Sequence, residues 1–343
     1  MKKILLIGPR IYKHDPAHVG GAIVLFEDLL EQARRRSIPF RVIDTNKKNY
    51  TNKLVAYISI VFQIVTIQFT VNHISLHSSK DYIYFAPIVI LIGKLFRKSI
   101  SLRKFGGEAW STYLSSKGIK KKTLKYIFKN VDFLFLEMKY MVYNFKKINK
   151  NTFWFPNVRM RLLSPNLPRS FKKKFVFISH VRREKGIDEI LEASLYLDES
   201  YTIDIYGEIP DLKYNIDYFK NYNVNYLGPL HPKEVISTLN EYNVLLLPSY
   251  KEGYPGIVIE AYSLGIPVIA TSLKGLREIV EIKKTGLLIE KKSIIELVEA
   301  IQYFNPMNYN NMVDNSYQKF DEFDSGQQTK RFFEILNLKG NIS

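Results

Sequence analysis

The sequence predicts an α/β protein made of two doubly wound, parallel-sheet domains of Rossmann-like type. Short apolar runs, typical of buried parallel strands, alternate with segments of helical spacing. The alternation stops over 158–174, a stretch with two prolines and a triple lysine, and then restarts. A length of 343 residues suits two domains. We therefore expect one domain over 1–160, a second over 173–325, and a C-terminal helical segment over 326–343.

The first domain is expected to begin with a strand at 4–8 and a helix that starts near Ile23. That helix ends in three arginines, cations that suit the negative end of a helix dipole. Further apolar runs predict the other strands of this half: 40–43, 82–85, 99–102, 132–136 and 152–156. In the second half, strands are expected at 175–178, 202–207, 225–228, 244–248, 267–270 and 286–289. A helix is expected over 187–197, and the last segment is amphipathic over 327–338.

Leu54 to Val71 is the longest uncharged stretch of the chain. It approaches the length of a membrane span, but it carries five Ser, Thr or Gln side chains. One set of apolar residues recurs at steps of three and four and predicts a strongly apolar helix face: Val55, Ile58, Phe62, Val65 and Phe69. We expect a core helix packed on the sheet, in preference to a membrane span. A helix lying in the membrane interface is the second interpretation.

Composition excludes several classes of protein. The chain has no cysteine, hence no disulfide or thiolate metal site, and a reducing cytosol is the expected compartment. The first strand follows Met1-Lys2-Lys3 directly, so no signal peptide is expected. A formal charge of +17 indicates an anionic partner. Because no nucleic-acid-binding motif is visible, we expect no nucleic acid and favour an anionic membrane surface.

Metal binding is also not expected from the histidines. His73 and His77 are four residues apart, as are His14 and His18, and each pair could share a helix face. Two histidines without a third ligand are more often ordinary polar side chains than a metal site.

The strongest local pattern is a strand, a glycine-rich turn and a helix over 243–265. The apolar run that ends at Pro248 predicts a buried strand, and helical spacing follows a turn of Gly, Pro and Gly. Open N–H groups at a helix start, together with the helix dipole, bind anions such as phosphate. Glu252 and Glu260 suit sugar hydroxyls instead, because a carboxylate accepts hydrogen bonds from two neighbouring hydroxyls. Phosphate and hydroxyls together indicate a sugar nucleotide.

These residues give the second half a specific resemblance to the retaining, GT-B-fold glycosyltransferases of family 4 type, the glycosyl transferases group 1. The resemblance covers most of 175–300 and rests on the segments 184–188 (EKGID), 227–230 (LGPL), 247–249 (LPS), 252–271 and 285–288 (TGLL). The first half is similar more weakly, through Gly20-Gly21 and Phe155-Pro156-Asn157. The resemblance implies the GT-B fold, two domains facing a central cleft with the C-terminal helix crossing back to the first domain.

The resemblance also implies roles for residues of the second domain. Glu252 would contact hydroxyls of the donor sugar, and Glu260 would hold the ribose hydroxyls. Lys185 would pair with a phosphate oxygen and neutralise charge as the diphosphate leaves. Leu230 lies where the family often contacts the base. The donor-binding turn itself would consist of Gly253, Tyr254, Gly256 and Ile257.

Near the phosphate lysine, one residue departs from the family pattern. The family usually has an arginine five residues before that lysine, and this chain has His180. Arg182 and Arg183 are close enough in sequence to supply the missing cation. A histidine beside a diphosphate could itself become protonated, since an opposite charge raises its pKa.

In the first domain, Gly20 and Gly21 would let the backbone approach the diphosphate or sugar, because neither has a Cβ. Many family members carry a His-Gly after the fourth strand, near the acceptor, whereas this chain has no histidine there. We expect an acceptor-side role among Arg103, Lys104 and Glu108, and which of the three acts in the chemistry stays open.

The resemblance implies a hexosyl- or N-acetylhexosaminyltransferase. It would move a sugar, with retention, from a nucleoside diphosphate to a glycan or lipid-linked acceptor in cell-surface polysaccharide synthesis, such as capsule or lipopolysaccharide. Because no Asp-X-Asp occurs, a metal-independent reaction without further cofactor is expected. The expected location is the cytoplasm, peripherally on the inner face of the membrane. Two alternatives stay open: a sugar-nucleotide epimerase, and a non-catalytic nucleotide-sugar- or membrane-binding subunit of a glycan-assembly complex.

Overall fold

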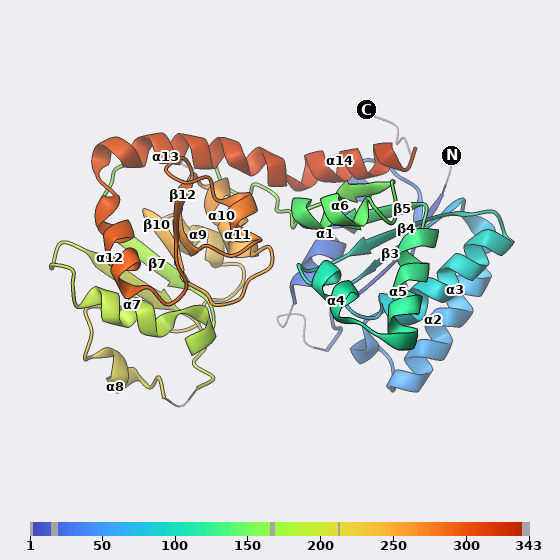
Figure 1. Cartoon of the computed structure of the whole chain (residues 1–343), viewed down its shortest axis with the longest axis horizontal. Helices are drawn as coiled ribbons and strands as arrows, with labels where there is room; N and C mark the ends of the chain where they lie inside the picture. The colour runs from blue at the N-terminus through green and yellow to red at the C-terminus, as the bar shows by residue number, and fades with distance from the viewer. Residues whose placement is uncertain (1–2, 15–19, 165–168, 212, 338–343) are drawn as a thin grey trace. The chain divides into compact units, whose positions relative to one another are not determined.

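The computed structural model describes residues 3–14, 20–164, 169–211 and 213–337. The chain divides into two compact units (Figure 1). Unit 1 consists of Met1–Val158 together with Ser325–Ser343, and unit 2 consists of Arg159–Asp324. Each unit contains one six-stranded sheet in which neighbouring strands pair in parallel. The predicted fold class, two doubly wound parallel sheets, is therefore confirmed.

Unit 1 has the strand order β2-β1-β3-β4-β5-β6. Its strands are β1 (Ile4–Gly8), β2 (Phe40–Asp44), β3 (His73–Ser78), β4 (Ser99–Lys104), β5 (Phe133–Leu136) and β6 (Thr152–Trp154). Its helices are α1 (Gly21–Arg35), α2 (Lys53–Ile67), α3 (Tyr82–Leu95), α4 (Ala109–Ser115), α5 (Gly118–Asn130), α6 (Lys139–Phe145) and α14 (Ser325–Ile335), with 3-10 turns η1 (Lys47–Asn49) and η2 (Gln68–Thr70). Helices α1 and α14 share a core with β1 on one face, and α3 packs on the other, where Gly93 meets Ile100.

One predicted strand of unit 1 is wrong. The run 82–85 is the first turn of α3, and the strand that precedes it, β3, was not predicted. Strand β3 is buried throughout but alternates apolar residues with His and Ser, so it lacks the apolar run of a central strand. Helix α3 has apolar residues on all sides, which makes its start resemble a strand.

The polar side chains of β3 can be buried because they form hydrogen bonds in a chain that includes Ser101 of β4. His73 Nε2 lies 2.8 Å from Ser101 Oγ, and the Ser101 hydroxyl donates to Ser75 Oγ at 2.7 Å. Ser75 Oγ in turn lies 2.9 Å from His77 Nε2. Burial lowers the pKa of His73 to about 3, and burial, with the neighbouring Arg103, holds the pKa of His77 well below its ordinary value. Both rings are therefore neutral strand residues, so the predicted shared helix face for this pair is wrong.

Helix α2 lies on the sheet, but not through the predicted face. Ala56, Ile60 and Ile64 are its buried residues. The predicted core face, represented by Ile58 and Phe62, is exposed by 61% and 67%. The helix is apolar on both sides, so the apolar spacing does not distinguish the side that the sheet covers. Within the described chain, Lys53–Thr70 is the one helical stretch long and apolar enough to span a bilayer.

Unit 2 has the strand order β12-β11-β10-β7-β8-β9. Its strands are β7 (Lys174–Ile178), β8 (Thr202–Tyr206), β9 (Asn225–Tyr226), β10 (Val244–Leu247), β11 (Val268–Thr271) and β12 (Gly286–Ile289). Its helices are α7 (Ile187–Ser194), α8 (Ile216–Phe219), α9 (Val235–Leu239), α10 (Gly256–Ser263), α11 (Leu276–Ile279), α12 (Ile294–Tyr303) and α13 (Pro306–Lys319), with 3-10 turns η3 (Arg183–Lys185) and η4 (Phe320–Phe323). All six strands of this half fall where the sequence predicts them, with differences of at most two residues at their ends.

The chain enters unit 2 through residues that the sequence suggested were part of a linker. Arg159 N donates to Phe323 O at 3.1 Å, and the guanidinium of Arg161 lies over the rings of Tyr317 and Phe320. The first residues after 158 are therefore fixed to the last helices of the unit.

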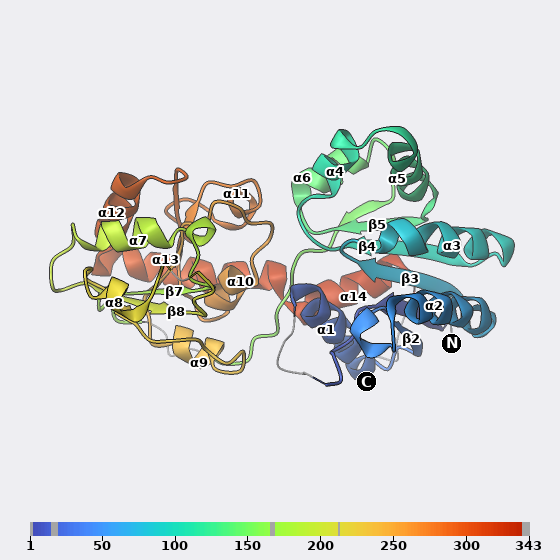
Figure 2. The same cartoon turned by 90° about the horizontal axis from the view of Figure 1, so that it is seen from below.

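Helix α14 returns to unit 1, as the resemblance implies. Phe332 and Phe333 are buried in the same core as Phe26 of α1. A hydrogen bond fixes the start of the helix to α1, since Ser325 Oγ donates to Asp28 Oδ2 at 2.6 Å. Figure 2 shows α14 lying along α1.

Candidate functional site

The candidate site of unit 2 lies where the direction of its strand order reverses. From the neighbours β7 and β10, the chain runs outward to β8 and β9 on one side and to β11 and β12 on the other. Loops that leave adjacent strands in opposite directions open a crevice at the carboxyl edge of a parallel sheet, where ligands bind. The two loops at this point are 179–186 after β7 and 248–255 after β10.

A glycine holds these two loops together. Gly186 has φ +80°, and a Cβ at this position would lie 2.3 Å from Pro248 O. Only glycine accepts both the conformation and the approach. The backbones are also bonded, because Tyr250 N donates to Glu184 O at 2.8 Å. Tyr250 anchors the second loop further through a 2.6 Å hydrogen bond to Glu189, and burial together with that carboxylate raises the pKa of Tyr250 to about 12.

The structure brings Lys185 and Glu252 into contact across the two loops. Lys185 Nζ lies 2.6 Å from Glu252 Oε1, and the side chains are exposed by only 29% and 13%. An ammonium and a carboxylate at the edge of a crevice offer one partner for an anion and one for hydroxyls. Both groups were predicted to bind the donor, on the phosphate and on the sugar respectively.

Helix α10 begins at Gly256, shortly after Glu252 in the chain. Its N-cap is Pro255, which makes no side-chain capping hydrogen bond, and no acidic residue lies in the first turn. The N–H groups of the first turn, among them those of Gly256 and Ile257, have no carbonyl partner inside the helix. Tyr254 is buried with its ring against Phe323, whereas Gly253, Gly256 and Ile257 are half-buried. The helix start is thus shaped to receive an anion.

Arg159 is a site residue that the sequence did not indicate. Its Nε lies 2.5 Å from Glu260 Oε1, and its Nη2 lies so close to Gly256 that a Cβ there would be 1.8 Å away. The guanidinium therefore lies at the start of α10 and holds one of the two predicted donor carboxylates. Arg159 belongs to a stretch without period or motif, and Glu260 is 101 residues away, so no local signal connects them.

The other predicted residues of unit 2 lie on the same sheet edge. His180 follows β7, and its Nδ1 is 3.5 Å from Glu208 Oε2, with both side chains more than half exposed. Arg182 is exposed and occupies the N-cap of η3. Leu230 is half-buried in the loop after β9. The structure therefore places these three residues, Lys185 and Glu252 in the connections at one edge of the sheet, together with the turn and with Glu260 of α10.

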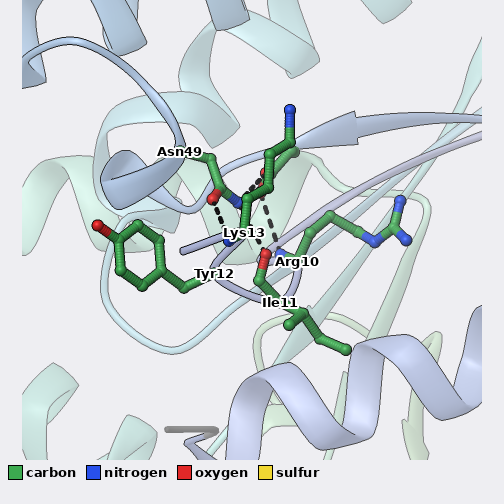
Figure 3. Close-up of a pocket in the computed structure, with 6 residues that line it drawn as sticks. Arg10, Ile11, Tyr12, Lys13 and Asn49 are labelled. Atoms are coloured by element: carbon green, nitrogen blue, oxygen red, sulfur yellow. Dashed lines mark hydrogen bonds between the residues drawn. The ribbon is translucent and has the colours of Figure 1, made fainter. Parts of the chain in front are cut away.

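In unit 1, Gly20 and Gly21 lie at the start of α1. Gly20 is its N-cap, and a Cβ at either position would meet nothing within 4 Å. Before them in the chain, Arg10, Ile11, Tyr12 and Lys13 line a cavity of about 420 Å³ together with Asp44 and Asn49 (Figure 3). Hydrogen bonds fix this loop, since Arg10 N donates to Asp44 Oδ1 and Lys13 N to Asn49 Oδ1. The cavity lies at the carboxyl ends of β1 and β2.

Two of the three predicted acceptor-side residues, Arg103 and Lys104, are buried in unit 1. The Arg103 guanidinium lies 3.4 Å from the centre of the Phe155 ring, and its Nη2 donates to Pro156 O at 3.0 Å. Lys104 Nζ donates to Phe105 O, and burial lowers the pKa of Lys104 to about 8, against the opposing effect of Glu137. Glu108, by contrast, is exposed at the start of α4. The structure thus leaves Glu108 exposed, whereas Arg103 and Lys104 are buried.

Within the described residues, no group of three or more His, Asp or Glu side chains is arranged to hold a metal ion. Lys185, Arg159 and the start of α10 are groups that can face a diphosphate.

Comparison with known proteins relates unit 2 to a known family. Residues 163–319 match the family model "Glycosyl transferases group 1". Over 162 residues the chain is 34% identical to the putative teichuronic acid biosynthesis glycosyltransferase TuaC of Bacillus subtilis, a match that covers 45% of this chain and 39% of the relative. It is 28% identical over 135 residues to the capsular polysaccharide biosynthesis glycosyltransferase CapM of Staphylococcus aureus, a match that covers 36% of this chain and 35% of the relative. These matches span less than half the length of the curated relatives.

The fold similarity extends over nearly the whole chain. The structure of HepE from Anabaena, in complex with UDP, superposes with a TM-score of 0.74 at 14% sequence identity, covering 98% of this chain and 100% of that one. The family model spans almost all of unit 2. Unit 2 is therefore a glycosyl transferases group 1 domain, and the chain has the GT-B fold.

Proposed function

We propose that this protein is a retaining glycosyltransferase of family 4 type. It transfers a hexosyl or N-acetylhexosaminyl group from a nucleoside-diphosphate sugar to a hydroxyl of a glycan or lipid-linked acceptor. The observation that carries the proposal is the Lys185–Glu252 contact beside the uncapped start of α10, at the switch point of the second sheet. Anion and hydroxyl partners adjoin there, as a sugar nucleotide requires.

Different residues of unit 2 bind different parts of the donor. The Lys185 ammonium and the first N–H groups of α10 neutralise the diphosphate as it leaves. Glu252 accepts hydrogen bonds from the sugar hydroxyls, and Glu260, held by Arg159, accepts those of the ribose. The bond between the anomeric carbon and the diphosphate oxygen breaks, and the acceptor oxygen bonds to that carbon from the same face. The acceptor proton passes to the departing diphosphate, so that no metal and no further cofactor is needed.

The proposed setting is the assembly of a cell-surface polysaccharide. TuaC and CapM are named for teichuronic acid and capsular polysaccharide synthesis, and HepE binds UDP. We propose that the protein works in the cytoplasm, peripherally on the inner face of the membrane, where a lipid-linked acceptor is within reach. The excess of basic residues supports an anionic surface as partner.

The test is turnover by the purified full chain. Incubation with a panel of nucleotide sugars and a membrane extract, followed by mass spectrometry, should give a glycosylated product for at least one donor. Glu252→Gln should lower the rate about 10²-fold or more, whereas Glu299→Gln on the exposed side of α12 should not. The proposal fails if no donor in the panel is bound, hydrolysed or transferred.

The same experiment separates the two alternatives. A nucleotide-sugar epimerase would convert the donor without any acceptor. A non-catalytic subunit would bind the donor without turnover. One observation favours the alternative of a non-catalytic subunit. The family resemblance implies an arginine at position 180, but this chain has His180, whose Nδ1 lies 3.5 Å from Glu208 Oε2.

A further inference from the structure

Helices α2 and α3 carry a continuous apolar surface on the side that faces away from the sheet. Six of its side chains are exposed by 61% to 70%: Leu54, Ile58, Phe62, Phe69, Leu91 and Leu95. We call this set the α2–α3 face. The two helices lie side by side, because the ring of Tyr57 contacts Tyr84 near their starts and Phe69 contacts Phe96 near their ends. Contiguous apolar surface of this kind marks an interaction site.

The helices that form and flank this face carry charge of one sign, and Asp81, the N-cap of α3, is paired with Lys47. Helix α5 packs against α3 on the side away from α2, and the two are linked by Lys94 Nζ, which donates to Asn130 Oδ1. Helices α2, α3 and α5 together contain seven lysines and no acidic residue. Four of the five lysines on α5 are exposed, namely Lys120, Lys122, Lys125 and Lys129. An apolar surface thus adjoins an array of cations.

We propose that the α2–α3 face docks on an anionic phospholipid bilayer, with its apolar side chains in the headgroup region and the α5 lysines on the lipid phosphates. Interfacial helices bind in this way, by apolar area on one side and lysines on the other. Each lysine near an anionic surface strengthens binding about fivefold. The inference deepens the proposed function, because it names the surface through which the enzyme reaches a lipid-linked acceptor.

Two other arrangements fit the structure less well. A membrane span is at odds with the sheet, because β2 and β3, which flank α2, both pair in parallel with β1. Residues Ala56, Ile60 and Ile64 would also have to leave the core of unit 1. Pairing of the face with a second copy would bring two lysine arrays together, without a carboxylate on these helices to offset them.

The experiment is vesicle flotation of the purified full chain without nucleotide sugar. Vesicles contain phosphatidylcholine alone or with about one third phosphatidylglycerol, in low and in high salt. The wild type should float with the anionic vesicles and only weakly with the neutral ones. Ile58→Ser with Phe62→Ser should lower the partition coefficient at least tenfold. Lys120→Gln, Lys122→Gln and Lys125→Gln together should lower it about a hundredfold at low salt and reduce its salt dependence.

Matched controls change equivalent residues elsewhere. Ile295→Ser removes a side chain exposed by 72% in unit 2, and Lys172→Gln with Lys233→Gln removes exposed charge from the same unit. These variants should float like the wild type, and circular dichroism should show every variant folded.

The inference is overturned if the wild type does not float, or if the Ile58/Phe62 variant floats equally well. Conversion of a dimer to a monomer by that variant, with flotation unchanged, would instead assign the face to a second copy. Transfer to a water-soluble acceptor by a protein that does not float would overturn this inference alone. Flotation without any donor turnover would overturn the proposed function alone.

Discussion

Arg159 Nε lies 2.5 Å from Glu260 Oε1, joining the segment where the chain enters unit 2 to the helix at its candidate site. Both side chains are about four-fifths buried, at 18% and 20% exposure. The pair fixes the orientation of the Glu260 carboxylate, which accepts hydrogen bonds from the ribose hydroxyls in the proposed function. It also places a cation beside the first turn of α10, next to Gly256.

Arg159→Ala should destabilise unit 2 by about 1–2 kcal/mol, because it leaves Glu260 partly buried without its charged partner. Nucleotide-sugar affinity should fall in the same variant. Urea unfolding followed by circular dichroism measures the first effect, and titration calorimetry measures the second. A double-mutant cycle with Glu260→Gln isolates the coupling between the two residues. A coupling energy near zero would show that the contact contributes nothing.

Lys185→Gln should lower kcat by about 10² to 10³, because the ammonium neutralises charge that develops as the diphosphate leaves. Donor affinity should change less than tenfold, since other groups also bind the ground state. Steady-state kinetics with separate donor titrations distinguish the two. Lys213→Gln, which breaks the exposed contact with Asp188, serves as the control and should leave kcat unchanged. An equal loss of kcat in both variants would argue against a specific role for Lys185.

Gly186→Ala should destabilise unit 2 by about 2–4 kcal/mol, since the new methyl group meets Pro248 O in addition to an unfavourable φ of +80°. Gly228→Ala is the matched control. Gly228 has φ +85°, but a Cβ there meets nothing within 4 Å, so its cost should be about 1 kcal/mol. Thermal unfolding of both variants makes the comparison. Equal losses would mean that the close approach of the two loops is unimportant.

The stability of unit 1 should fall as the pH drops below about 6.5. Burial lowers the pKa of His73 to about 3 and lowers that of His77 as well, so below pH 6.5 the unfolded chain binds protons that the folded chain does not. The expected loss is roughly 1.4 kcal/mol per pH unit for each histidine. Both tryptophans, Trp110 and Trp154, belong to unit 1, so the fluorescence midpoint in urea reports on it. His73→Gln should flatten the dependence, and an unchanged slope would contradict the assignment.

Transfer activity should survive removal of divalent cations. The proposed site neutralises the diphosphate with Lys185 and the start of α10, so EDTA should change the rate less than twofold. Rates before and after dialysis against EDTA, with and without added Mg²⁺ or Mn²⁺, provide the measurement. A rate that disappears with EDTA and returns with Mg²⁺ would contradict metal independence.

The fold class was predictable because parallel strands buried on both faces appear as short apolar runs between helices. Unit 2 follows this rule closely, and its strands fall where the apolar runs are. Strand β3 does not follow it, because His73, Ser75 and His77 are buried in one chain of hydrogen bonds that runs through Ser101 of β4. Such mutual hydrogen bonding depends on a neighbouring strand, and no local pattern encodes it.

The site was predictable where its residues are near one another in sequence. Glu252 and the start of α10 lie in one strand–turn–helix segment, and Lys185 follows an adjacent strand. Arg159 was not predictable, because its partner is brought to it only by the tertiary fold. Helix α2 shows the same limit, since an apolar pattern on both sides does not say which side the sheet will cover.

The return of α14 has a consequence for biosynthesis. Unit 1 is made of two chain segments with the whole of unit 2 between them, and Phe332 and Phe333 complete its core. A nascent chain therefore exposes the apolar surface of α1 and β1 until the ribosome has synthesised the last helix, whereas unit 2 can close earlier. Chaperone binding during translation should thus concentrate on the first half of the sequence, although it is made first.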